Sequence, residues 1–166
     1  MKLTDLPKVK PFALHPDDRA AIEREKPNYD HPRAVVIEAL KIVQARDGWV
    51  CDEAIHAIAE VLGVGDSDVE GVATFYNLIF RQPVGRHVIK ICDSIGCFLC
   101  GYEELQKAFS KRLGIGFGET TSDNRFTLLP IVCLGACDRA PVLMIDEDTH
   151  FNVKTTDIDA LLERYA

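Results

Sequence analysis

Apolar positions recur at helical spacing through the first half of the chain, in segments separated by short turns. Four such segments follow one another: 16–25, 32–48, 52–63 and 67–80. Proline opens the first two, and Gly48 and Gly63 close the second and third, which are typical start and stop signals of helices. With only short turns between them, these segments are predicted to pack as a small four-helix bundle over residues 16–82.

The fourth helix has the most specific predicted start. Ser67 is followed three residues later by Glu70, the pattern of a capping box, and the helix is expected to run on to Phe80. Two aromatic residues, Phe75 and Tyr76, fall within it. Core aromatics are the first interpretation, and a surface that docks on a partner protein is the alternative.

In the second half of the chain, the pattern of apolar and polar residues changes to the alternation typical of β-strands. Alternating or β-branched segments predict strands at 86–92, 125–133, 142–146 and 151–153, and amphipathic segments predict helices at 102–114 and 155–165. Pro130 marks an edge strand or an irregularity in its strand, and the acidic segment 147–150 is expected to form the turn of a hairpin. The order β-α-β-β-β-α is that of a minimal thioredoxin-like domain.

The predicted organisation is therefore of the α+β class, with three parts. Residues 1–15 form a flexible N-terminal arm, 16–82 the helical bundle domain, and 83–166 the thioredoxin-like α/β domain. The boundary is placed where Pro83, Val84 and Gly85 interrupt both patterns.

Composition narrows the classes of function. The chain has 166 residues, a formal net charge of -7 and 47% hydrophobic residues. It shows no basic face, so nucleic acid is not expected as a partner, and no apolar run approaches the roughly 20 residues of a membrane-spanning helix. Nothing at the N-terminus reads as a secretory signal, so a reducing cytoplasm is expected, where clustered cysteines more often bind metal or do redox chemistry than form disulfides.

Two cysteine pairs carry the candidate chemistry. Cys92 and Cys97 form C-x4-C after the first strand, and Cys133 and Cys137 form C-x3-C after the second, with 35 residues between the pairs. Both spacings are wider than the C-x2-C typical of zinc knuckles, and they suit the bulkier [2Fe–2S] cluster, which takes four thiolates. Glycines inside both loops would let the backbone approach closely. Apolar neighbours (Ile95, Phe98, Leu134 and Ala136) are expected to limit water. Zinc binding and redox-active thiols remain open alternatives.

Two further cysteines stand outside this pattern. Cys100 forms C-x-x-C with Cys97 at a predicted helix start, which is where thioredoxins carry their active disulfide. A dithiol oxidoreductase using Cys97 and Cys100 is therefore an alternative function. The simpler interpretation is that Cys100 is a small residue packed against the sheet. Cys51, in the helical half, is expected to take no part in the chemistry of the other cysteines.

The motifs CDSIGC and CLGACDRAP, together with VATFY, resemble those of the family of E subunits of bacterial respiratory NADH:quinone oxidoreductases, complex I. The resemblance extends over residues 15–166. It implies a thioredoxin-like domain with one [2Fe–2S] cluster, whose ligands would be Cys92, Cys97, Cys133 and Cys137. It also implies a subunit that transfers electrons and has no catalytic residue of its own.

The resemblance also implies partner subunits and a cellular location. NADH and FMN would be bound by a neighbouring flavoprotein subunit, and other peripheral-arm subunits would lead electrons on to quinone. The chain would lie in the cytoplasm, peripheral to the inner membrane. Similar subunits serve NAD-linked hydrogenases and formate dehydrogenases, which are alternative parent complexes.

Overall fold

The computed structural model describes residues 13–165, so nearly all of the predicted N-terminal arm lies outside the described residues. The chain divides into two units, Met1–Pro83 and Val84–Ala166, and each is described by itself. Among the described residues, no helix combines the length and the apolar character needed to cross a membrane.

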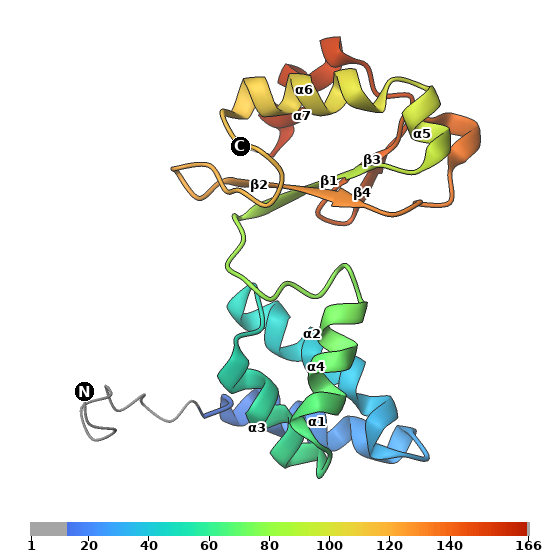
Figure 1. Ribbon diagram of the computed structural model, residues 1–166. Coiled ribbons are helices and arrows are strands. Elements are labelled where there is room, and N and C mark those ends of the chain that lie inside the picture. The colour runs from blue at the N-terminus through green and yellow to red at the C-terminus, as the bar shows by residue number, and fades with distance from the viewer. Residues whose placement is uncertain (1–12, 166) are drawn as a thin grey trace, which may run out of the picture. The chain divides into compact units, whose positions relative to one another are not determined.

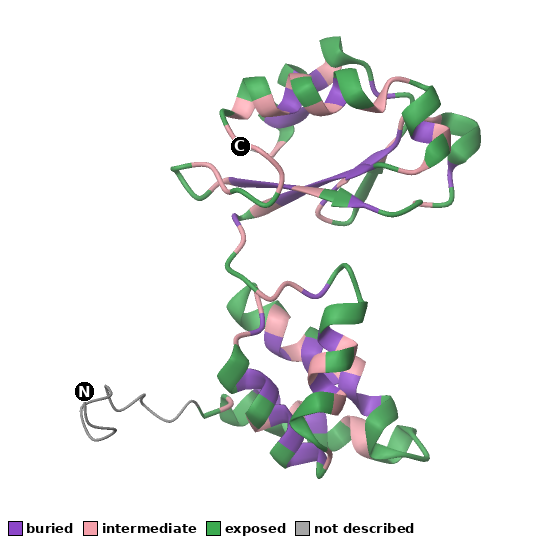
Figure 2. Cartoon of the chain, in the orientation of Figure 1, coloured by how far each residue is buried: buried purple, intermediate pink, exposed green. Residues whose placement is uncertain are grey.

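The first unit consists of helices, as predicted. Its α-helices are α1 (Pro16–Glu25), α2 (Val36–Asp47), α3 (Asp52–Leu62) and α4 (Asp66–Phe75), with 3-10 turns at Lys26–Asn28 and Pro32–Val35 (Figure 1). Each α-helix contributes a fully buried side chain to one core: Ile22, Leu40, Ile58 and Val69. Figure 2 shows buried positions on the inward sides of the helices, with exposed positions outside. The core explains why amphipathic segments with little helical stability of their own are ordered here.

The helix α2 ends at Gly48, whose φ of 79° lies in the left-handed region and whose N–H bonds to the carbonyl of Gln44. A Cβ at this position would meet nothing within 4 Å, so substitution costs only backbone strain. We expect Gly48→Ala to lower the free energy of unfolding by about 1 kcal/mol and Gly48→Asn by less, because asparagine tolerates this conformation. Urea denaturation of the two variants measures the difference, and equal stability of Gly48→Ala and the unchanged chain would contradict it.

The boundaries predicted for α4 are wrong at both ends. The helix begins at Asp66 with Gly65 as its N-cap, and the Asp68 carboxylate accepts the Gly65 N–H at 3.3 Å; the predicted cap at Ser67 and Glu70 lies inside the helix. The helix stops at Phe75, where the backbone becomes extended. Beyond it the amide of Gln44 bonds to the chain twice, accepting the Phe80 N–H at 2.6 Å and donating to the Leu78 carbonyl at 2.7 Å. These bonds replace those that a longer helix would have made.

The early end of α4 also moves its two aromatic residues. The Phe75 side chain is 76% exposed and Tyr76 is 47% exposed. The expectation that they form part of the core is therefore wrong, because both lie where the helix turns into the connection that follows.

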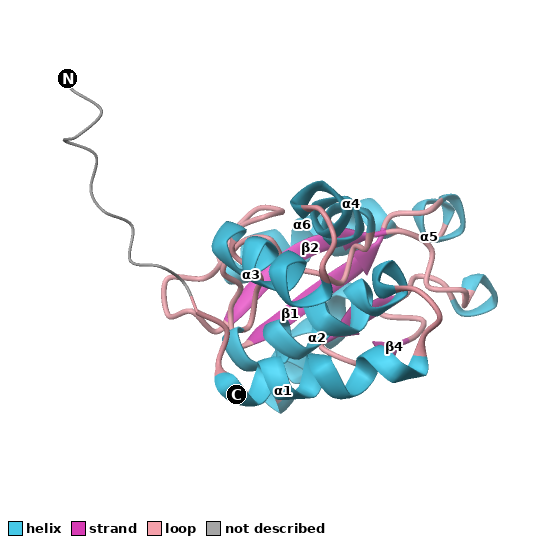
Figure 3. Cartoon of the chain, turned by 90° about the horizontal axis from the view of Figure 1, so that it is seen from below, coloured by secondary structure: helices cyan, strands magenta, loops and turns pink. Residues whose placement is uncertain are grey.

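The second unit contains a four-stranded sheet with helices. Its elements are β1 (His87–Cys92), α5 (Ile95–Leu99), α6 (Tyr102–Leu113), β2 (Phe126–Ile131), β3 (Leu143–Ile145), β4 (Asp148–His150) and α7 (Ile158–Arg164). The strand order is β2-β1-β3-β4, with β1 and β2 parallel and the other pairs antiparallel. Figure 3 shows the neighbouring strands β1 and β2 in magenta. Helices α6 and α7 cover one face of the sheet, where Phe109 and Leu161 pack against Ile89 and Leu128. The α+β fold class is confirmed.

Two details of this unit differ from prediction. The fourth strand is Asp148–His150, whereas 151–153 was expected, because the hairpin turns on only two residues, Asp146 and Glu147. Asp146 takes a φ of 54°, which suits such a tight turn. The short helix α5 was not predicted, since five residues are too few to show a helical period. Pro130 does lie on an edge strand, β2.

Candidate metal centre

The two cysteine loops leave the sheet at the same edge. Strands β1 and β2 are parallel neighbours, and Cys92 at the end of β1 is in register with Ile131 at the end of β2. Parallel strands deliver the loops that follow them to one edge of a sheet. The loop after β1 carries Cys97 and the loop after β2 carries Cys133 and Cys137, so two segments far apart in sequence come together.

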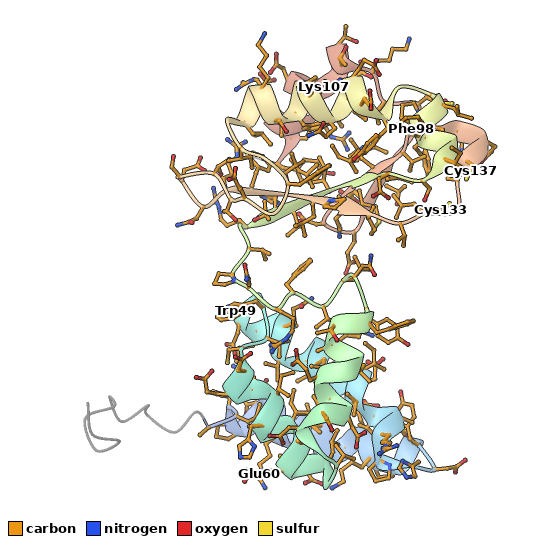
Figure 4. The ribbon with its side chains drawn as sticks, in the orientation of Figure 1. Trp49, Glu60, Phe98, Lys107, Cys133 and Cys137 are labelled. Atoms are coloured by element: carbon orange, nitrogen blue, oxygen red, sulfur yellow. The ribbon has the colours of Figure 1, made fainter. Side chains whose placement is uncertain are left out.

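The second loop brings its two sulfurs into contact. The Sγ atoms of Cys133 and Cys137 lie 3.4 Å apart, and the N–H of Gly135 donates to the Cys133 sulfur at 3.4 Å. Gly135 has a φ of 77°, which lets the loop curl around the sulfur. Both cysteines are exposed. Figure 4 shows them at one end of the second unit, on the same end as Phe98.

The first loop holds its sulfurs in the interior. Cys92 and Cys97 are each 2% exposed and pack in a small apolar cluster with Ile131, Ala136 and Val142. Cys97 is the buried residue of the short helix α5 that follows β1. The pair is therefore shielded from water, unlike the pair on the second loop.

The two loops meet at Gly96. A Cβ on this residue would lie 3.5 Å from the Cβ of Cys137 and 3.7 Å from its sulfur. Glycine thus keeps the first loop close to the second pair of thiols.

The protonation of the thiols follows from these surroundings. Burial, with a smaller contribution from Cys92, raises the pKa of Cys97 to about 11. The Gly135 N–H lowers the pKa of Cys133, while the nearby Cys133 raises the pKa of Cys137. Sulfurs this close resist becoming anions together, and a bound metal cation removes that resistance because coordinated thiols are deprotonated.

The donor set fits a [2Fe–2S] cluster. Four soft sulfur donors stand as two pairs, and such a cluster takes two thiolates on each of two irons. A structural zinc site instead gathers its four donors around a single ion.

The remaining cysteines lie elsewhere. Cys100 follows the last residue of α5 and is exposed, so the expectation that it packs against the sheet is wrong. Gly101, with a φ of 100°, turns the chain directly after it and starts α6. Cys51 precedes α3 in the first unit, where it packs partly against the helical core.

The apolar neighbours of the cysteines divide into two groups. Leu134 and Ala136 pack beside the buried thiols, as expected. Ile95 is 73% exposed and Phe98 is 49% exposed, so the expectation that they keep water out is wrong. A five-residue helix can bury only one face, and in α5 that face carries Cys97.

A sheet with helices and a pair of cysteine loops at its edge defines a thioredoxin-like iron–sulfur protein. Comparison with protein families agrees: residues 22–166 match the model of the thioredoxin-like [2Fe-2S] ferredoxin, and the chain belongs to this family. The resemblance that the sequence motifs indicated is confirmed.

Individual relatives narrow the family to one kind of subunit. The chain is 59% identical to the E subunit of NADH-quinone oxidoreductase from Escherichia coli K12 over 159 residues, which is 96% of each chain. It is 56% identical to the protein of the same name from Pseudomonas aeruginosa over 165 residues, 99% of each. Among solved structures, an NAD+-reducing [NiFe]-hydrogenase in the H2-reduced state resembles it with a TM-score of 0.66 and 25% identity. That match covers 78% of this chain and only 22% of the hydrogenase chain.

Sequence reasoning did not single out Lys90, a buried charge in the strand that leads to Cys92. Lys90 is buried at the centre of β1. The signal was present in the strand HVIKIC, where Lys90 stands between two isoleucines and two positions before Cys92.

Proposed function

We propose that Cys92, Cys97, Cys133 and Cys137 bind one [2Fe–2S] cluster, and that the chain transfers single electrons as the E subunit of an NADH-quinone oxidoreductase. The observation that carries this proposal is the meeting of the two cysteine loops at the common edge of β1 and β2. Identity of 59% to an E subunit of this enzyme, over 96% of both chains, supports the parent complex.

Each part of the site has a task in this function. The thiolates supply the four ligands, and the Gly135 N–H, which already donates to the Cys133 sulfur, stabilises negative charge there. The buried side of the site, around Cys92 and Cys97, excludes water and lowers the local dielectric. When bound, the cluster accepts and returns one electron at a time.

We propose that the electrons are exchanged with FMN on a neighbouring flavoprotein subunit that also binds NADH. The sequence has no G-x-G-x-x-G loop that would bind a dinucleotide in this chain. Exposed apolar side chains beside the cysteine loops, Ile95, Phe98, Leu99 and Val132, offer contact surface to other subunits of the peripheral arm. The complex would hold the chain at the cytoplasmic side of the inner membrane.

Purification under anaerobic conditions tests the proposal. The protein is expected to be reddish-brown, to contain iron and acid-labile sulfide in equal amounts, and to give an EPR signal after reduction. Affinity purification from the native cell should bring down an FMN-binding and quinone-reducing assembly. A nickel–iron or formate-oxidising partner in its place would assign the chain to one of the other NAD-linked complexes.

The dithiol alternative is tested at Cys100, which the proposed ligand set does not use. We expect Cys100→Ser to keep its full content of iron and sulfide. The buried Cys97, with its raised pKa, is poorly suited to be an attacking thiolate, so neither form of the protein should reduce insulin disulfides. Loss of the cluster in this variant would show that a ligand has been misassigned, and insulin reduction abolished by the substitution would establish the dithiol function.

A further inference from the structure

The second cysteine loop ends in a turn that lies at the surface. This 3-10 turn, Cys137–Arg139, has no buried residue, whereas Ala136 directly before it is buried beside Cys92 and Cys97. A segment with few buried contacts opens locally at little cost in free energy. The position of Cys137 therefore depends on the contacts that the turn makes at the surface.

Arg139 makes such a contact at the end of the turn. Its guanidinium lies over the ring of Phe151, with Cζ 3.5 Å from the ring centroid. This is the geometry of a cation–π interaction, in which the negative face of the ring attracts the cation. Arg139 also pairs with Asp138, at 3.8 Å between its Nε and a carboxylate oxygen. That partner is its neighbour in the chain, so only the ring of these two partners connects the turn to a distant segment.

The segment that carries Phe151 is fixed to the rest of the unit. The Asn152 N–H donates to the Arg139 carbonyl at 2.8 Å. The Val153 N–H donates to the Pro141 carbonyl at 3.2 Å, and the Val153 side chain is buried in the core formed with the sheet. Asn152 has a φ of 52°, a left-handed conformation that asparagine tolerates. The ring of Phe151 is thus presented to the end of the cysteine loop from a firm base.

We infer that Phe151 is a positioning residue for Cys137, because its ring holds Arg139 and so limits how often the exposed turn moves away from the proposed cluster site. This inference rests on the proposed ligation by the four cysteines. Phe151 is 36% exposed and the Arg139 side chain is 50% exposed, so their contact contributes little to the core. Its effect is expected at the turn, where opening would give a chelator access to the iron.

The expected size follows from the strength of the contact. An exposed cation–π interaction shifts the equilibrium between the held and the open turn by about two- to fivefold. Where the turn opens and closes faster than a chelator removes iron, the rate of cluster loss follows the population of the open form. The rate should therefore rise by the same factor when the contact is removed.

The loss of visible absorption from the anaerobically purified full chain in excess EDTA tests this inference. Phe151→Leu keeps an apolar side chain without the ring, and Arg139→Met keeps a long side chain without the charge. Each is expected to lose the cluster about two- to fivefold faster than the unchanged chain. Phe151→Tyr keeps the aromatic face and should lose it at the unchanged rate. Arg112→Met, the matched control, should also leave the rate unchanged, since Arg112 is a similarly exposed arginine of α6 that pairs with Asp159.

A double variant tests whether the two residues act as a pair. If they act only through each other, Phe151→Leu combined with Arg139→Met loses the cluster no faster than either single variant, whereas independent effects multiply. Circular dichroism identifies the variants that keep their fold. Should Phe151→Leu not fold, the comparison of Arg139→Met with Arg112→Met makes the same prediction.

The outcomes separate the inference from the function on which it rests. Single variants that lose the cluster at the unchanged rate would overturn the role of Phe151 and leave the proposed function standing. An equal acceleration in Phe151→Tyr, or a double variant whose acceleration is the product of the two single effects, would also overturn it. An unchanged chain that contains no iron would overturn the proposed function, and this inference with it.

Discussion

Replacement of Cys137 by alanine is expected to abolish the cluster. The variant should fall from about two irons and two sulfides per chain to nearly none, because one iron loses a thiolate that no other donor can replace. Alanine is chosen over serine because a serine oxygen could still bind iron. Iron and sulfide analysis, with the EPR signal after reduction, measures the loss.

The matched control for this variant is Cys51→Ala. It removes one thiol from the same chain, but from the start of α3 in the first unit. Its iron and sulfide content should equal that of the unchanged protein. Full cluster occupancy in Cys137→Ala would contradict the assignment of this residue as a ligand.

The second large effect is expected at Phe109 in α6. This side chain is 0% exposed and packs between the helix and the sheet, against residues such as Ile89 and Leu128. Truncation to alanine leaves a cavity in the core that supports both cysteine loops. We expect Phe109→Ala to lower the free energy of unfolding by about 3–5 kcal/mol.

Urea denaturation followed by circular dichroism measures this change, with both proteins carrying the same amount of iron, since a bound cofactor adds stability. Lys107→Ala is the control on the same helix. Lys107 lies on the outer side of α6 (Figure 4) and is largely exposed, so its truncation should change stability by no more than about 0.5 kcal/mol. A loss below about 1 kcal/mol for Phe109→Ala would show that the core is not packed as described.

The sequence predicted those features that depend on repeated local patterns. Four helices follow from apolar spacing, and Gly48 and Gly63 end two of them in the left-handed conformation. The alternation in HVIKIC predicted β1 and placed Cys92 at its end. Since the thioredoxin-like order of elements fixes which strands are neighbours, the proximity of the cysteine loops could also be expected.

The errors arose where single tertiary contacts override such patterns. Gln44 bonds to the backbone near Phe80 from another helix, and no pattern within 67–80 shows that α4 stops early. Cys100 was expected inside because cysteine is usually buried, but the turn at Gly101 leaves it in solvent. The sequence shows a charged residue, Lys90, within the strand, but its burial depends on the sheet around it.

The structure gives the proposed site two unlike halves. Cys92 and Cys97 are buried in an apolar cluster, while Cys133 and Cys137 are exposed on a loop that meets the first at Gly96. In the proposed function, the buried half would lower the dielectric around the irons, and the exposed half would offer a short path for electrons to a neighbouring protein. The exposed side chain of Phe98 lies at the same end of the unit.

Four thiolates of this chain are proposed to hold both irons of one cluster. Mössbauer spectroscopy of the anaerobically purified, ⁵⁷Fe-enriched protein tests this ligation most directly. The spectra are expected to show two irons in tetrahedral sulfur coordination, both ferric before reduction and one of them ferrous afterwards. An iron with a nitrogen or oxygen ligand, or a preparation that holds zinc without sulfide, would contradict it.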